Sequence, residues 1–189
     1  MIRAVLFDLY GVLGLNGWQE FKHKHFSEDP VQWELLRSLG QAVDAREASY
    51  EDLVNEIARA SGVAHAEVRQ SLEGTKPNYK LLEFIRHELS DYKVGVLSNA
   101  NSHVMEKIFS PEDLSLFDDV VLSVDTGLTK PDETMFALAC ERLDVMPDEC
   151  LFVDDKTSNL EAAQKVGMHP VHFQDVEQAS RAIKRELAL

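Results

Sequence analysis

Seven residues that follow short apolar runs of the sequence carry groups suited to chemistry on an anion. They are Asp8, Tyr10, Ser98, Asn99, Lys130, Asp154 and Asp155. Three carboxylates brought together would repel one another, and their burial would be costly unless a cation neutralised them. Mg²⁺ prefers a few carboxylates, a carbonyl and water, and it leaves positions open for a phosphate. Lys130 adds a positive charge able to hold a phosphoryl oxygen and to keep a nucleophilic carboxylate ionised.

The elements that must bring these residues together are short buried strands. Five runs rich in Val, Leu and Phe predict them, at residues 2–7, 93–97, 120–124, 150–153 and 170–173. Helix-like segments lie between or after the later strands, at residues 79–89, 103–109, 132–143, 158–166 and 176–189. This alternation predicts an α/β fold, a Rossmann-like parallel sheet with helices on both faces. Ligands of such sheets bind at the carboxyl ends of the strands, where the seven residues fall.

Residues 15–78 are far longer than a crossover between two parallel strands requires. Their apolar residues recur at spacings of three and four in the segments 18–26, 30–39, 50–60 and 64–72, so we expect a small helical domain. The core would then be residues 1–14 and 79–189. Asn16-Gly17 and the segment 75–78 are rich in turn-forming residues and would be the two hinges.

The predicted helix at residues 158–166 has recognisable capping residues at both ends. Thr157 or Ser158 can cap its amino end, with Glu161 three residues after Ser158 as in a capping box, and Gly167 can close its carboxyl end.

The charge balance excludes several partners. Nineteen basic and 33 acidic residues give a net charge of −14, which disfavours a nucleic acid or an anionic membrane surface as a partner.

The longest stretch without a charged residue, 94–105, is 12 residues long and too short to span a bilayer. No secretory signal precedes Asp8, and Cys140 and Cys150 lack metal-ligand spacing. We therefore expect a cytoplasmic protein with reduced core thiols and no zinc site.

Four motifs, in order and in strand context, resemble those of the haloacid dehalogenase-like (HAD) hydrolase superfamily. They are Phe7-Asp8-Leu9-Tyr10-Gly11-Val12-Leu13, Leu97-Ser98-Asn99, Thr129-Lys130-Pro131, and Phe152-Val153-Asp154-Asp155 with Asn159 four residues later. The resemblance covers essentially the whole chain, and residues 15–78 stand where that family has a helical cap. The chain looks most like the sugar-phosphate phosphatases and the phosphatase-like domain of epoxide hydrolases.

The resemblance implies a role for each motif in hydrolysis of a small phosphorylated metabolite. Asp8 would attack phosphorus to form an aspartyl-phosphate, which water then hydrolyses. Mg²⁺ would be held by the Asp8 carboxylate, the Tyr10 backbone carbonyl and Asp155, with Asp154 as a further ligand directly or through water. Ser98, the Asn99 backbone and Lys130 would bind the phosphoryl oxygens, while Asn159 would orient the loop. Mg²⁺ is thus the expected cofactor.

Tyr10 departs from the family pattern and leaves other interpretations open. Phosphatases of the family usually have an aspartate there as general acid and base, and a phenol with a pKa near 10 is a poor base at neutral pH. Asp-Leu-Tyr-Gly is similar to the metal-free 2-haloacid dehalogenases, whose nucleophile attacks carbon, although these lack the paired acids Asp154 and Asp155. A weakly active member that mainly binds a ligand or partner is the third interpretation. Tyr10 itself could also be a packing residue without a catalytic role.

Overall fold

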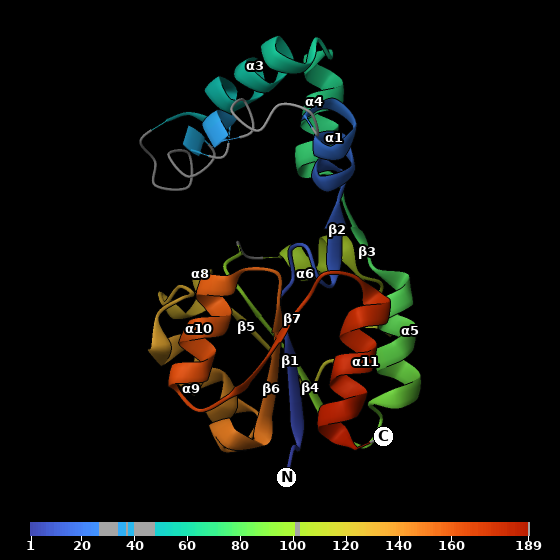
Figure 1. Ribbon diagram of the computed structural model, residues 1–189, viewed down its shortest axis with the longest axis vertical. Helices are drawn as coiled ribbons and strands as arrows, with labels where there is room; N and C mark the ends of the chain where they lie inside the picture. Colours follow the sequence, from blue (N-terminus) through green and yellow to red (C-terminus); the bar gives the residue numbers. More distant parts are fainter. Residues whose placement is uncertain (27–33, 37, 40–47, 101–102, 189) are drawn as a thin grey trace. The chain divides into compact units, whose positions relative to one another are not determined.

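In the computed structural model, a five-stranded parallel sheet lies between helices in the larger of two compact units (Figure 1). The model describes residues 1–26, 34–36, 38–39, 48–100 and 103–188. The strand order is β5-β4-β1-β6-β7, with every neighbouring pair parallel. The strands are β1 (Ala4–Phe7), β4 (Lys93–Ser98), β5 (Asp119–Leu122), β6 (Cys150–Asp154) and β7 (His169–His172). This confirms the predicted Rossmann-like α/β fold.

The direction of winding puts a ligand crevice beside β1. From β1 the chain adds β4 and then β5 on one side, and it returns to add β6 and β7 on the other. The strand order therefore reverses between β1 and β6, and such a switch point is where ligands bind in open α/β sheets. Asp8 directly follows β1, and Asp154 ends β6.

Two helical layers cover the sheet, as the side-chain alternation of β1 requires. Val5 and Phe7 belong to an apolar cluster with α5 (Tyr79–Glu88) and α11 (Val176–Leu187), whereas Ala4 and Leu6 belong to one with α9 (Glu133–Arg142) and α10 (Thr157–Lys165). In Figure 1 the two pairs of helices lie on opposite sides of the sheet. Successive strand residues point to opposite faces, so both faces of β1 are buried.

The remaining core elements are short. They are α6 (Val104–Ile108), α7 (Pro111–Leu114), α8 (Ser123–Thr126) and the 3₁₀ turn Pro147–Glu149. Cys140 and Cys150 are free and buried in the core, as the sequence predicted.

The described chain divides into two compact units, Met1–Leu15 with Lys76–Leu189, and Asn16–Thr75. The second contains α1 (Gly17–Phe26), α3 (Tyr50–Ser61) and α4 (His65–Glu73), which share a small apolar core that includes Phe21, Leu36, Ile57 and Val68. Most of the predicted helical segment 30–39 lies outside the described residues; 34–36 and 38–39 are helical.

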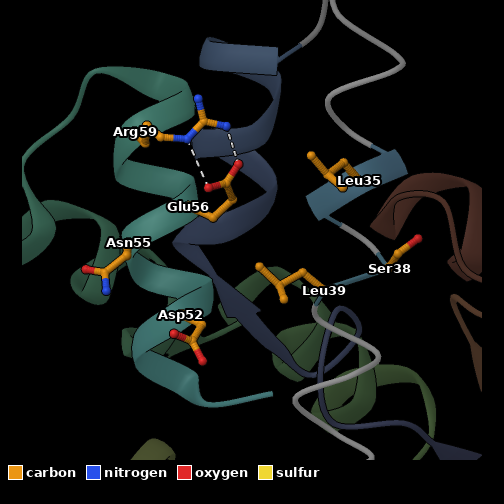
Figure 2. A pocket seen from close by; sticks show the side chains of 7 residues that line it. All are labelled: Leu35, Ser38, Leu39, Asp52, Asn55, Glu56 and Arg59. Atoms are coloured by element: carbon orange, nitrogen blue, oxygen red, sulfur yellow. Dashed lines mark hydrogen bonds and ion pairs between the residues drawn. The ribbon is translucent and has the colours of Figure 1, made fainter. Parts of the chain in front are cut away.

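An open pocket of about 600 Å³ lies in this second unit (Figure 2). Its lining residues are Leu35, Ser38, Leu39, Asp52, Asn55, Glu56 and Arg59. Arg59 pairs with Glu56, three residues earlier on α3, and the Asp52 carboxylate accepts from Ser49 in the capping box of the same helix.

Three local predictions differ from the structure. The predicted strand 120–124 ends at Leu122, because Ser123 begins α8. The hinge segments are not open turns: β2 (Gly14–Asn16) and β3 (Thr75–Pro77) pair as a two-stranded sheet. Neither Thr157 nor Ser158 caps α10, whose N-cap is Lys156 without a side-chain hydrogen bond. The Asp154 carboxylate instead accepts from the Lys156 N–H and so shapes the turn into the helix.

The aromatic pair Phe136 and Phe152 gives a test of this packing. Their rings meet edge to face at 5.2 Å in the cluster that holds α9 against β6. Phe136→Ala is expected to lower the free energy of unfolding by about 3–5 kcal/mol, because it leaves a cavity in a fully buried site. Urea denaturation measures this loss, and Val124→Ala, at a half-exposed position of α8, is the control, with a change within about 0.5 kcal/mol. Equal stability of the two variants would contradict the packing.

Candidate functional site

Asp8 is fixed where β1 ends. Its N–H donates to the Val153 carbonyl of β6 at 2.9 Å, which continues the sheet pairing one residue past the strand. Its side-chain Oδ1 accepts from the Leu9 N–H at 2.7 Å. The following loop closes tightly, since Gly14 N–H donates to the Leu9 carbonyl at 2.7 Å and Leu13 N–H to the Asp8 carbonyl at 3.3 Å. The backbone of Asp8 is therefore fixed by hydrogen bonds on both sides, and its carboxylate by the Leu9 N–H.

Gly11 lets this loop approach Asp155. Its φ is +86°, in the left-handed region, and a Cβ there would lie 2.7 Å from Asp155 Oδ2. A side chain would both strain the backbone and displace the carboxylate, so glycine is required at this point.

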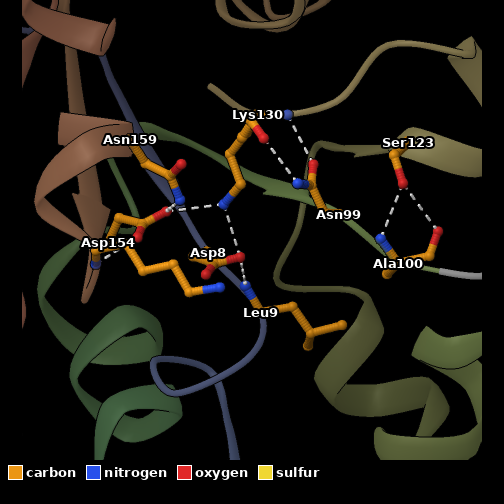
Figure 3. Close-up of polar contacts among 9 residues, drawn as sticks. Asp8, Leu9, Asn99, Ala100, Ser123, Lys130, Asp154 and Asn159 are labelled. Atoms are coloured by element: carbon orange, nitrogen blue, oxygen red, sulfur yellow. Dashed lines mark hydrogen bonds and ion pairs between the residues drawn. The ribbon is translucent and has the colours of Figure 1, made fainter. Parts of the chain in front are cut away.

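Lys130 joins the two strand ends. Its Nζ lies 2.8 Å from Asp8 Oδ1 and 2.8 Å from Asp154 Oδ2 (Figure 3). The Lys130 side chain is only 2% exposed, and its Nζ also lies 5.2 Å from the centre of the Phe152 ring. A charge buried this deeply is stable only when it is paired, and here two carboxylates from neighbouring strands pair with it.

Asp154 is committed to contacts within the protein. Its Oδ2 accepts from Asn159 Nδ2 at 2.9 Å as well as from Lys130, and its Oδ1 accepts from Lys156 N–H at 2.8 Å. Both oxygens are therefore engaged, and Asn159 orients this carboxylate. The arrangement makes Asp154 chiefly a partner of Lys130.

Asp155 is the less satisfied acid of the pair. Its Oδ1 is buried without a hydrogen-bond partner among the described residues. Asp8, Asp154 and Asp155 each offer an oxygen within 4.8 Å of the others. Burial raises the pKa of Asp155, and the charges of Asp8 and Asp154 raise it further. Burial likewise raises the pKa of Asp8, against the opposing effect of Lys130.

The charge of this cluster fits a divalent cation. Three carboxylates face one ammonium, and burial together with the neighbouring carboxylates raises the pKa of both Asp8 and Asp155. A hard cation would supply the missing charge and accept the unpartnered oxygen of Asp155 as a ligand. The residues present therefore fit Mg²⁺.

Ser98 ends β4 and Asn99 follows it, at the same edge of the sheet. The Ser98 Oγ is buried and has no hydrogen-bond partner in the described part of the chain. Ser98 also lowers the pKa of Asp8, so the two residues are close. The Asn99 side chain clamps the Lys130 backbone: its Oδ1 accepts from Lys130 N–H at 2.7 Å, and its Nδ2 donates to the Lys130 carbonyl at 2.9 Å.

A second clamp stabilises the same loop. Ser123 Oγ accepts from the Ala100 N–H at 3.1 Å and donates to the Ala100 carbonyl at 3.3 Å (Figure 3). Among the described residues of this segment, the buried side-chain oxygen without a hydrogen-bond partner is therefore the Ser98 Oγ.

Tyr10 lies at the edge of the cluster and is partly buried. Burial raises the pKa of its phenol above the ordinary value, and the charge of Asp8 raises it further. The phenol therefore stays protonated at neutral pH and does not supply a base.

Sequence reasoning missed the contact of His172 with the site. His172 ends β7, and its Nε2 lies 3.2 Å from the Asp155 backbone carbonyl. The spacing in sequence gives no signal for this contact, because it depends on β6 and β7 being neighbours in the sheet.

Comparisons with known proteins place the chain among hydrolases. A family model described as haloacid dehalogenase-like hydrolase matches residues 2–167. The chain is 36% identical over 184 residues to D-ribitol-5-phosphate phosphatase of Bacteroides thetaiotaomicron, covering 88% of this chain and 89% of that protein. It is 28% identical over 196 residues to (S)-2-haloacid dehalogenase 1 of a Pseudomonas species, covering 91% and 84% respectively.

A solved structure and a longer relative extend these likenesses. The structure of a predicted HAD-like family hydrolase from Porphyromonas gingivalis has a TM-score of 0.66 and 27% identity, and the match covers 100% of this chain and 99% of that one. Mouse acyl-CoA dehydrogenase family member 10 is 37% identical over 93 residues, but the match spans only 9% of its length. No helix among the described residues is long and apolar enough to cross a membrane.

Asp155→Asn tests the charge imbalance. Without divalent cations, the variant is expected to raise Tm by about 2–4 °C at pH 7, because it removes one of three repelling charges. The folded-state pKa of Asp155 is raised, so the contribution of this residue to the stability of the parent falls as pH rises above about 4, and the difference between parent and variant vanishes below that pH.

Thermal unfolding at several pH values measures this difference. Asp91→Asn, at an exposed position, is the matched control and should leave Tm unchanged. A Tm for Asp155→Asn below that of the parent at every pH would contradict the proposed repulsion among the three carboxylates.

Proposed function

Because the chain belongs to the haloacid dehalogenase-like hydrolase family, we propose that it is a Mg²⁺-dependent phosphatase of a small organic phosphomonoester. The observation that carries the proposal is the group Asp8, Asp154 and Asp155, with Lys130 paired to the first two and one Asp155 oxygen unpartnered. An acid at the carboxyl end of β1 that contacts a buried ammonium is suited to attack an anionic phosphoryl group.

Mg²⁺ would be held by the carboxylates of Asp8 and Asp155 and by the backbone carbonyl of Tyr10. Asp154 would contribute mainly through Lys130, since both of its oxygens accept from protein groups. When bound, the cation neutralises the carboxylates and polarises the phosphoryl oxygens.

The reaction has two steps on Asp8. In the first, a carboxylate oxygen of Asp8 forms a bond to phosphorus, and the bond from phosphorus to the substrate oxygen breaks. In the second, water attacks phosphorus, and the bond to Asp8 breaks to release inorganic phosphate. Lys130 favours the ionised form of Asp8 against the effect of burial, and with Ser98 and the Asn99 N–H it stabilises the charge on the phosphoryl oxygens. The free Ser98 hydroxyl supports this role.

Dehalogenation is the second candidate function. The sequence Asp-Leu-Tyr-Gly at residues 8–11 and the likeness to a haloacid dehalogenase favour it. The unneutralised Asp155 opposes it, because the carboxylate of a haloacid would be repelled. The higher identity to a sugar-phosphate phosphatase also favours the first function.

The helical insertion, residues 15–78, has a place in this proposal as a cap that selects the substrate and excludes water. Its three described helices have an apolar core of their own, and the chain enters and leaves it through the paired strands β2 and β3. A unit built in this way can keep its internal structure while its connections change conformation.

Removal of the nucleophile and removal of the metal test the proposed function together. With Mg²⁺ and an aryl phosphate, Asp8→Asn is expected to lower kcat by at least about 10³-fold, because no aspartyl-phosphate can form. Exhaustive chelation should abolish the activity of the parent, and added Mg²⁺ should restore it.

Three outcomes would contradict this proposal. Phosphate release that survives chelation would exclude the metal-dependent mechanism. Metal-independent halide release from 2-chloropropionate would favour the dehalogenase. An Asp8→Asn protein with all properties of the parent would indicate a binding protein. A panel of phosphorylated metabolites then identifies the substrate.

Tyr10→Asp tests whether proton transfer limits the reaction. A carboxyl group can protonate the leaving oxygen and then activate water, so kcat is expected to rise by about 10²-fold. Tyr10→Phe is the matched control and should retain the parental kcat, because the phenol supplies no base. Steady-state kinetics at several pH values measure both. A Tyr10→Asp variant no faster than the parent would show that another group already transfers the proton.

A further inference from the structure

Asn78 stands where the chain returns from the insertion, and it contacts the loop that follows Asp8. It lies between β3 and α5 and is only 4% exposed. Its backbone N–H donates to the Leu13 carbonyl at 2.8 Å, and its side-chain Nδ2 donates to the Val12 carbonyl at 2.9 Å. Two adjacent carbonyls, 65 and 66 residues earlier in sequence, are thus satisfied by one residue.

The Asn78 side chain does not make the hydrogen bond that is usual for an asparagine at a helix N-cap. Asn78 is the N-cap of α5, where asparagine is favoured because its side-chain oxygen can accept from the first turn of the helix. In this structure no such hydrogen bond forms. The side chain is directed at the loop instead, so the role of Asn78 extends beyond the end of the helix.

The loop that receives these bonds is the one that fixes the nucleophile. Leu13 N–H donates to the Asp8 carbonyl and Gly14 N–H to the Leu9 carbonyl. Leu9, Val12 and Leu13 are fully buried, and apolar packing anchors them without specifying where their carbonyls point. The donors on Asn78 specify that direction.

We propose that Asn78 is a positioning residue that holds the loop of residues 9–14, and through it Asp8, to the chain leaving the insertion. The catalytic consequence rests on the proposed function. The structural link between Asn78 and the loop does not depend on that function, because hydrogen exchange can measure its hydrogen bonds without a substrate.

Two substitutions separate positioning from helix capping. Asn78→Asp keeps a strong N-cap but cannot donate to the Val12 carbonyl. Asn78→Ser is also a good cap, is neutral, and has a side chain too short to replace the amide. If Asn78 served only the helix, both variants would behave as the parent. Ser110→Ala, which removes the capping box of α7, is the control for loss of a cap without contact to the loop.

Hydrogen exchange and steady-state kinetics are the two measurements. In Asn78→Asp and Asn78→Ser, the amides of Leu13 and Gly14 are expected to exchange about tenfold faster than in the parent, because one buried hydrogen bond to the loop is lost. With an aryl phosphate and Mg²⁺, kcat should fall about tenfold while KM changes by less than about threefold. Ser110→Ala should lower Tm and change neither quantity.

The outcomes distinguish this inference from the proposed function. Unchanged exchange at Leu13 and Gly14 in both variants would overturn the inference, and so would faster exchange with an unchanged kcat. A parent without phosphatase activity would overturn the proposed function; the exchange rates alone would then decide whether Asn78 holds the loop.

Discussion

The buried ammonium of Lys130 between Asp8 and Asp154 is the interaction on which the rest of the site depends. It joins the ends of β1 and β6, where the strand order reverses. Neither the ammonium nor the two carboxylates would be stable in this interior alone, because each needs the opposite charge to offset its lost hydration. The Asn99 side chain clamps the Lys130 backbone, and Asn159 fixes Asp154. The surrounding polar contacts therefore serve mainly to keep this pairing in place.

The same pairing bears on how a protein of net charge −14 would accept the anionic substrate proposed for it. The cluster of three acids contains more negative charge than Lys130 can neutralise, and burial, with a further contribution from the neighbouring carboxylates, raises the pKa of Asp8 and Asp155. A divalent cation would reverse the local sign of the charge, whereas charges elsewhere on the surface are screened by solvent and salt. The total charge thus bears on possible partners of the surface, whereas the cluster is the feature on which the proposed substrate class depends.

The choice between phosphate hydrolysis and dehalogenation, which Tyr10 leaves open, depends on the charge balance between the three acids and Lys130. Tyr10 stands where phosphatases of this kind usually have an acid, and its protonated phenol leaves the cluster without a base at that position. The residues 8–11 alone favour dehalogenation as much as phosphate hydrolysis. Asp155, on another strand end, separates the two, because its unpartnered oxygen favours a cation over the carboxylate of a haloacid.

The sequence by itself determined the α/β fold and the residues that gather at one edge of the sheet. Buried parallel strands require continuous apolar runs, and the residues after them must lie at their carboxyl ends. It did not determine the donors and acceptors that connect those residues. Neither Thr157 nor Ser158 caps α10, the Asp154 carboxylate instead accepts from the N–H of the N-cap residue Lys156, and the side chains of Asn78 and Asn99 contact distant backbone groups. Only the tertiary structure decided these contacts, because a local pattern specifies which faces are buried but not which distant polar group arrives to satisfy a given carbonyl or N–H.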